Sequence, residues 1–455
     1  MDEHATCRPA RFLASLAVAL AAISLAALAT WAGGVPLAAA QARVDPAAAA
    51  APAPRFQAGE LLVRFRTGVA VASAQDVLSA HGLRQVDEIP ALGVRRVRVP
   101  AGQEEALAAA LRLDTRVDYA ELNGILTVQE TPNDPYFVSG SQWGMTRIGA
   151  PAAWDQVTGT YPITIAVVDT GVWGSHPDLL AKMVDGWYHY TESGTIFDGP
   201  IPAGTPHDPY GHGTHVAGIA AASTNNGLGV AGVSWGAPIM PFRSQASNGN
   251  GSDYDVATGI AWVTDHGAKV INISLGGPTY VQTLADAVAY AWQHGALVVA
   301  AAGNSAYVSP TYPAAYPFAL GVAATDINES PGYGFAHGPW VDVAAPGVGV
   351  LSTLPSCSKA LYMCSDSRYG QASGTSMATP HASGLAALIW SANPALTNAQ
   401  VTYILTSTAE KVGPVGYVNG WNEYLGYGRI NAAAAISATP RFYHLYLPLW
   451  LNNWP

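Results

Sequence analysis

Three polar residues stand where the sequence passes from an apolar run into a turn or a helix. Asp169 ends the run "ITIAVVD", His212 lies between two glycines in "YGHGTHVAG", and Ser376 precedes the apolar part of "SGTSMATPHASGLAALIW". Singly, each has an ordinary structural explanation, since aspartate and serine often occupy turns and helix caps. Together, they are the groups of acyl-transfer catalysis: the imidazole takes the hydroxyl proton, and the carboxylate fixes the imidazole's tautomer and stabilises its cation.

The residues around the serine indicate where its helix begins. Proline is tolerated in the first turn of a helix, so Pro380 predicts a helix that starts near Ser376, with the hydroxyl at the positive end of the helix dipole. Thr375 or Ser373 could equally cap this helix. His215 follows the first histidine by three positions rather than the four of a helical metal pair, and we interpret it as a packed core histidine.

Residues 131–438 contain the elements that must position these groups. Apolar runs of strand length, such as "ITIAVVD", "KVINISL" and "LVVAAAGN", alternate with helical stretches. Strands without polar alternation are buried on both faces, which predicts an α/β fold with a parallel sheet covered by helices on both faces. Ligands of such sheets bind beyond the carboxyl ends of the strands. We therefore expect the polar residues to meet at that edge.

Residues 56–130 follow a different pattern. The runs "ELLVRF", "GVRRVRVP" and "VDYAELNGILTV" predict strands, and "SAQDVLSAHG" and "GQEEALAAALRL" predict helices. The order strand–helix–strand–helix–strand predicts a small α+β unit with its helices on one face of a sheet. Residues 43–55, rich in alanine and proline, are predicted to be a linker.

Residues 1–42 have the features of an export signal: two arginines, an apolar stretch and a small-x-small pattern that ends at Ala42. The alternative is a membrane anchor, because a span needs roughly 20 apolar residues and the run is just that long. The small-residue site favours cleavage, which predicts a secreted protein with no membrane attachment afterwards. The net charge of -10 at pH 7 argues against nucleic acid as a partner.

The segments "VVDTGV", "GHGTHVAG" and "SGTSMATPH" resemble the three catalytic motifs of the subtilisin-like serine proteases, in that family's order. Within the family, "TPNDPYF", "INISLGG" and "WVDVAAPG" are similar to the thermitase group, and the resemblance covers residues 131–438. It implies a subtilisin-like fold and a serine endopeptidase whose catalytic triad is Asp169, His212 and Ser376.

The resemblance also implies how a polypeptide substrate is held. Asn304, at the end of "AAAGN", would point its amide at the developing oxyanion. The backbone of Ser274, Leu275 and Gly276 would pair with the substrate as an added strand. No acidic residue appears in "AGNSAYVSP", so we expect broad specificity with a preference for a large apolar or aromatic residue before the cleaved bond (P1).

A structural calcium ion is a further implication of the resemblance. Two aspartates, an asparagine and three backbone carbonyls would supply the hard oxygen ligands that calcium prefers, whereas the alternative makes them ordinary turn residues. These ligands are Asp134, Asp178, Ser223, Asn226, Leu228 and Val230. The stretch after Gly186 has few acids where a second thermitase-like site should lie, so the resemblance carries only the first site over to this chain.

By the same resemblance, residues 56–130 are an inhibitory prosegment, which templates the slow-folding sheet and covers the cleft until it is cut near residues 128–131. A retained binding domain is the alternative. The segment "PSCSKALYMCSDSRYGQ" is longer than in the thermitase group and could lie over the cleft. Its Cys357 and Cys364 would form a disulfide or remain two buried thiols. Residues 439–455 form an aromatic tail to which we assign no mechanism.

The leading hypothesis is therefore a secreted, monomeric endopeptidase made as an inactive precursor. A second hypothesis is an inactive protein of the same fold that binds a surface, but every catalytic position is filled. A third is a lipase or esterase, but no G-x-S-x-G motif surrounds Ser376.

Overall fold

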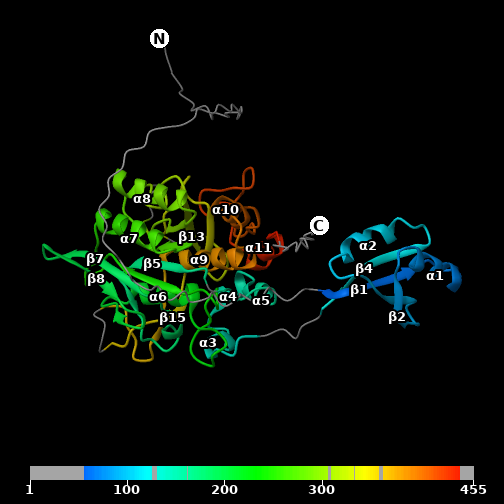
Figure 1. The fold of residues 1–455 in the computed structure, drawn as a ribbon. Helices are drawn as coiled ribbons and strands as arrows, with labels where there is room; N and C mark the ends of the chain where they lie inside the picture. Colours follow the sequence, from blue (N-terminus) through cyan, green and yellow to red (C-terminus); the bar gives the residue numbers. More distant parts are fainter. Residues whose placement is uncertain are drawn as a thin grey trace, which may run out of the picture. The chain divides into compact units, whose positions relative to one another are not determined.

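The computed structural model describes residues 56–125, 131–160, 162–305, 309–332, 334–357 and 362–440. The chain divides into two compact units between residues 126 and 127, and Figure 1 shows the elements of both. The predicted export signal, the linker and residues 441–455 of the tail lie outside the described residues, as does most of the predicted cleavage region.

The N-terminal unit is an antiparallel sheet with two helices. Leu61 and Val63 alternate along its first strand and share one apolar core with Leu78 and Leu111 from the two helices, so the helices cover one face as predicted. The sheet order is β2-β3-β1-β4. The elements are β1 Phe56–Phe65, α1 Val71–Ala80, β2 Arg84–Ile89, β3 Val94–Arg98, α2 Glu104–Arg112 and β4 Val117–Gly124.

The predicted strand–helix–strand–helix–strand order of this unit was incomplete, because strand β2 precedes β3. Its sequence "RQVDEI" is polar and mostly exposed, so it has no apolar alternation to mark it as a strand. Pairing with β3 across the short turn before Val94 makes it a strand.

The C-terminal unit is built on an eight-stranded sheet in the order β14-β13-β12-β11-β5-β10-β7-β8. Every neighbouring pair is parallel except the last, which confirms the predicted parallel sheet. The strands are β5 Ile165–Asp169, β7 Gly186–Glu192, β8 Thr195–Ile201, β10 Ile239–Arg243, β11 Val270–Ile273, β12 Leu297–Ala301, β13 Ala319–Thr325 and β14 Val343–Pro346.

Strands β7 and β8 form an antiparallel hairpin that the sequence pattern did not predict. Ser193 and Gly194 join them, and both have a positive φ, as a two-residue hairpin turn requires. The hairpin occupies the stretch in which a second calcium site of the thermitase type would have been sought.

Helices cover both faces of this sheet, as predicted. Ile165 and Val167 of β5 pack into the core formed with α6 and α9, whereas Ala166 and Val168 pack into the core formed with α7 and α8. The helices are α3 Pro135–Val138, α4 Trp143–Arg147, α5 Ala150–Trp154, η1 Leu180–Lys182, α6 His212–Ala221, α7 Asp253–Asp265, α8 Gln282–Gln293, α9 Thr375–Ala392, α10 Asn398–Ser407 and α11 Ala432–Ala438. Among the described residues, no helix combines the length and apolar character needed to cross a membrane.

Two short strand pairs complete the unit. They are β6 Val172–Trp173 with β9 Pro206–His207, and β15 Val350–Thr353 with β16 Tyr369–Ala372.

The strand register brings several predicted residues to one edge of the sheet. Val270 of β11 pairs with Ile165 of β5, so Ser274, one residue beyond β11, is level with Asp169 at the end of β5. Strand β12 is in register with β11 on its other side and leads to Asn304 at the same edge. The residues that follow the carboxyl ends of the adjacent strands β5, β11 and β12 therefore lie together at this edge.

Candidate active site

Asp169, which is buried, and His212, which is partly buried, form a hydrogen-bonded pair. The Asp169 carboxylate is only 1% exposed, and its Oδ1 accepts from Nδ1 of His212 at 2.7 Å and from the Thr170 N–H at 2.7 Å. With Nδ1 donating, Nε2 of His212 is left as an acceptor. Burial acts to lower the pKa of His212, but the charge and hydrogen bond of Asp169, with the charge of Asp208, outweigh it and raise this pKa.

Ser376 is the second residue of helix α9. Gly374 occupies the N-cap position without a side chain to cap the helix, so neither Thr375 nor Ser373 is the cap. Pro380 lies in the second turn, not the first as predicted. Because proline has no N–H, the Ser376 carbonyl lacks its helical donor, and the Ser274 hydroxyl donates to that carbonyl at 2.8 Å instead.

The Ser376 hydroxyl is 7% exposed and donates to the Ser274 carbonyl at 2.8 Å. Within the described part of the chain, no hydrogen bond joins Ser376 to His212. The structure thus brings Asp169 into contact with His212, and Ser376 into contact with Ser274. For Ser376 to give its proton to the imidazole, the hydroxyl must rotate away from the Ser274 carbonyl.

Asn304 is fixed by helix α9. Its Oδ1 accepts from the Thr375 N–H at 2.8 Å and from the Thr375 hydroxyl at 3.0 Å. With the carbonyl end of the amide held, the NH₂ end remains available as a donor. The N–H of Ser376 is also free of helical bonding, because it lies in the first turn of α9.

Beyond β11, the backbone at Gly276 and Gly277 runs beside Tyr312. Gly277 and Tyr312 exchange two backbone hydrogen bonds, of 2.9 Å and 2.8 Å. A Cβ on Gly276 would lie 2.7 Å from Cγ2 of Thr311, and a Cβ on Gly303 would lie 2.3 Å from its Oγ1. Thr311 therefore packs against both glycines. The sequence analysis did not identify Thr311, because no motif around it marks a pocket. Residues 306–308, which precede Thr311, lie outside the described residues.

Asp208 is the other functional candidate that sequence reasoning missed. Its carboxylate is 1% exposed and accepts the N–H groups of Tyr210, Gly211 and Thr214 and the hydroxyls of Thr170 and Thr214. Burial raises the pKa of Asp208, while these hydrogen bonds oppose the rise. Asp208 ties the residue after Asp169 to the first turn of α6. The sequence feature that could have pointed to Asp208 is its position four residues before His212.

His215 is a buried histidine, in agreement with the prediction. It is 0% exposed, and its Nε2 lies 3.0 Å from the carbonyl oxygen of Gly370. Burial lowers its pKa to about 4, so it is neutral at ordinary pH. Over the described ranges, no cluster of three or more histidine, cysteine or acidic side chains is arranged to hold a metal.

The predicted calcium ligands do come together. Asp134 and Asp178 are 0% exposed, and Asp134 accepts the Asn225 N–H at 2.8 Å. Asp178 accepts from the Asn226 amide at 2.9 Å and from the Val230 N–H at 3.0 Å. Burial, with a smaller effect from the charge of Asp178, raises the pKa of Asp134 although backbone hydrogen bonds oppose the rise.

The backbone of the same loop also fits a hard cation. No described residue donates a hydrogen bond to the carbonyl oxygens of Ser223, Leu228 or Val230. Two buried carboxylates of like charge beside three unpaired carbonyls form an oxygen-rich set, which is the chemistry that calcium prefers.

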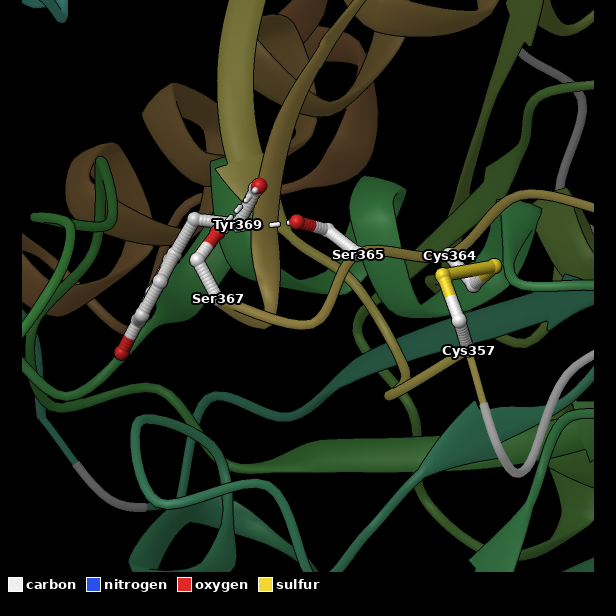
Figure 2. Close-up of a disulfide and its surroundings, with 5 residues drawn as sticks. All are labelled: Cys357, Cys364, Ser365, Ser367 and Tyr369. Atoms are coloured by element: carbon white, nitrogen blue, oxygen red, sulfur yellow. Dashed lines mark hydrogen bonds between the residues drawn. A yellow bond between two sulfur atoms is a disulfide. The ribbon is translucent and has the colours of Figure 1, made fainter.

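Cys357 and Cys364 form a disulfide, which decides between the two alternatives left open by the sequence (Figure 2). The disulfide closes part of the loop between β15 and β16, and residues 358–361 of that loop lie outside the described residues.

Comparisons with known proteins agree with this arrangement. A model of the subtilase family matches residues 162–428, and a model of the fervidolysin N-terminal prodomain matches residues 42–123. The thermophilic serine proteinase of Bacillus sp. (strain AK1) is 37% identical over 379 residues, or 83% of this chain and 87% of that protein. Thermitase of Thermoactinomyces vulgaris is 43% identical over 306 residues, or 67% of this chain and 99% of that protein.

A solved structure is similar as well. Fervidolysin from Fervidobacterium pennivorans, described as a keratinolytic enzyme related to subtilisin, matches with a TM-score of 0.60 at 30% identity. The match covers 85% of this chain and 62% of that chain.

Proposed function

Because the chain belongs to the subtilase family of serine endopeptidases, with an N-terminal prodomain, we propose that it cleaves polypeptides through an acyl-enzyme on Ser376. The observation that supports this most directly is the hydrogen bond of 2.7 Å between the buried Asp169 and the partly buried His212. It orients the imidazole as a general base at the edge of the sheet where Ser376 lies.

The proposed reaction has two halves. First, Nε2 of His212 takes the Ser376 proton as Oγ attacks the peptide carbonyl carbon, and the imidazolium then protonates the leaving amine nitrogen as the C–N bond breaks. Next, His212 takes a proton from water, which attacks the ester carbonyl, and returns it to Ser376 Oγ as the ester bond breaks. Asp169 stabilises the imidazolium in both halves.

The oxyanion of each tetrahedral intermediate would be held by two donors, the amide NH₂ of Asn304 and the Ser376 N–H. Their orientation is prepared before the substrate arrives, since Oδ1 of Asn304 is bound to Thr375 and helix α9 fixes the backbone. A single preorganised donor of this kind typically lowers a barrier by about 3 kcal/mol.

Substrate would bind as an extended strand along Ser274, Leu275 and Gly276, with its P1 side chain between Gly276 and Gly303. Thr311 supplies a methyl group and no charge at the base of this space. This supports the expected preference for an apolar or aromatic P1 residue, with broad tolerance.

We also propose that residues 56–130 inhibit the precursor until they are cut off. The prodomain match over residues 42–123 supports this role. Secretion of the enzyme, and its action as a monomer, remain part of the proposal and rest on the export-signal pattern of residues 1–42 and on the family.

A calcium ion would be held by Asp134, Asp178 and Asn226 with the carbonyls of Ser223, Leu228 and Val230. When bound, calcium would neutralise the two buried carboxylates and cross-link three remote segments of the chain. It would act on stability rather than on the reaction.

The decisive experiment measures casein and p-nitroanilide peptide hydrolysis by the processed protein and by Ser376→Ala. We expect activity that a sulfonyl fluoride abolishes and that Ser376→Ala lacks. Hydrolysis that persists in the alanine variant would refute the assignment, and a folded wild type without hydrolysis would favour the surface-binding alternative. Cleavage of p-nitrophenyl esters but of no peptide would favour the esterase alternative.

A further inference from the structure

The disulfide-closed loop between β15 and β16 is not used in the reaction described above. Cys357 and Cys364 are seven positions apart within this loop. Figure 2 shows the disulfide beside the returning arm, in which the Ser365 and Ser367 hydroxyls are 2.8 Å apart and Ser367 donates to the Tyr369 carbonyl at 3.1 Å. The Ser365 N–H also donates to the Pro355 carbonyl at 3.0 Å, so a hydrogen bond next to the disulfide also ties the two arms together.

This loop lies directly against the two residues that precede His212. The Met363 N–H donates to the Tyr210 carbonyl at 2.7 Å, and the Tyr362 and Tyr210 rings stack with their centroids 4.8 Å apart. A Cβ on Gly211 would lie only 1.8 Å from the Met363 carbonyl oxygen. The glycine at the N-cap of α6 is therefore required by this contact as well as by its φ of +103°.

The base of the same hairpin is fixed to helix α6. The Thr353 hydroxyl donates to the Thr214 carbonyl, and the Ser352 hydroxyl donates to the His215 carbonyl, each at 2.7 Å. Contacts at Ser352 and Thr353, and again at Tyr362 and Met363, therefore join the described parts of this hairpin to the residues on either side of His212. Tyr362 nevertheless remains 57% exposed, so an apolar face is left open next to Tyr210, two residues before His212.

Sheet order indicates which part of a substrate would meet this face. The P1 space between Gly276 and Gly303 lies on the β11–β12 side of Ser274, whereas His212 is bound to Asp169 on the β5 side. Successive side chains of an extended peptide point to opposite sides. The residue before P1 (P2) therefore points away from the P1 space and toward His212, whose two preceding residues contact Tyr362 and Met363.

We propose that Tyr362, held in place by the Cys357–Cys364 disulfide and stacked on Tyr210, is a specificity-determining residue that favours apolar and aromatic side chains at P2. This inference rests on the proposed endopeptidase function. It assigns Tyr362 and the Cys357–Cys364 disulfide a role in substrate choice, through a ring that touches substrate and a disulfide that positions the ring.

The test compares kcat/KM for p-nitroanilide peptides that share one P1 residue and carry Gly, Ala, Leu or Phe at P2. Wild type should prefer Leu and Phe. Tyr362→Ala should reduce the Phe-to-Gly ratio by about fivefold, the scale of one lost aromatic contact, with less than about a twofold change for the Gly peptide. Cys357→Ser with Cys364→Ser should reduce the ratio in the same direction.

The matched control is Tyr403→Ala, which removes a 70% exposed tyrosine from α10 and should leave the ratio unchanged. Because Tyr362 is exposed, its alanine variant should fold even if the cysteine variant does not. An unchanged ratio in active Tyr362→Ala overturns this inference alone. Absence of hydrolysis in folded wild type overturns the proposed function and this inference with it.

Discussion

At the scale of single residues, the chemistry depends on how buried charges are paired. The Asp169 carboxylate compensates for the burial of His212 and leaves the pKa of that imidazole above its ordinary value. The neighbouring carboxylate of Asp208 adds to the same effect and anchors the first turn of α6. The pKa of His212, the proposed general base, is therefore raised by two acids, of which Asp169 forms a hydrogen bond with it.

This pairing predicts the acid side of the pH profile. A general base must be neutral, so kcat/KM should rise with pH through a midpoint above about 6.5, the ordinary pKa of histidine. Asp169→Asn should move this midpoint to lower pH, because the imidazolium loses its partner. It should also lower kcat by roughly 10³–10⁴-fold, because the tautomer is no longer fixed.

The measurement is kcat/KM for one peptide from pH 4 to 10. Asp286→Asn, a change of the same chemistry on the exposed face of α8, is the control and should reproduce the wild-type profile. A midpoint in Asp169→Asn that equals or exceeds that of wild type would contradict the role given to the pair.

At the scale of elements, the loop before Val230 joins segments that are remote in sequence. Asp134 precedes α3, Asp178 precedes η1, and Tyr369 of β16 donates its hydroxyl to Asp178 at 3.0 Å. Without a cation, two buried carboxylates would repel each other at this junction. The stability of the whole C-terminal unit should therefore respond to calcium.

We expect EDTA to lower the melting temperature and calcium to restore it. Calcium at a thousand times its Kd would stabilise the fold by about 4 kcal/mol. Magnesium should restore less, because it requires near-ideal octahedral geometry. Asp178→Asn should lower the melting temperature and reduce the calcium response, as measured by calorimetry with an inactivated enzyme.

The control variant for this measurement is Asp198→Asn in the β7–β8 hairpin, whose carboxylate is 54% exposed. It should keep the full calcium response. Equal melting temperatures in calcium and in EDTA for the wild type would show that the loop is held by its hydrogen bonds alone.

At the scale of the whole molecule, the chain consists of two units with separate cores. The N-terminal unit has its own apolar cluster of residues between Leu61 and Ala120, and the C-terminal unit is built from two further clusters. A unit with its own core can fold as a template and later be removed without loss of the other core.

If the prosegment is removed by the enzyme's own activity, processing depends on the catalytic serine. The wild-type protein should lose its N-terminal unit, with a new N-terminus near residues 128–131, whereas Ser376→Ala should retain it. Mass spectrometry of both ends of the purified proteins measures this. A processed Ser376→Ala variant, made without another protease present, would show that the enzyme does not cut itself.

The sequence by itself determined the fold class, the buried strands and the family, because these follow from local patterns. Apolar runs predict buried strands wherever they occur, and three motifs in a family's order predict Asp169, His212 and Ser376 as the catalytic residues. The sequence also predicted the oxygen-rich loop around Asp178, since the residue types and loop length were sufficient.

Only the tertiary structure decided which remote residues meet. Thr311, Asp208 and Tyr362 became candidates because strand register and loop packing bring them to the site, and no local pattern encodes these contacts. Strands β2, β7 and β8 were missed for the same reason, since pairing with a neighbour, rather than apolar alternation, makes them strands. Pro380 shows the same limit. The sequence indicates that Pro380 cannot donate a hydrogen bond to the Ser376 carbonyl, but it does not show that the Ser274 hydroxyl, about a hundred positions earlier in the chain, donates instead.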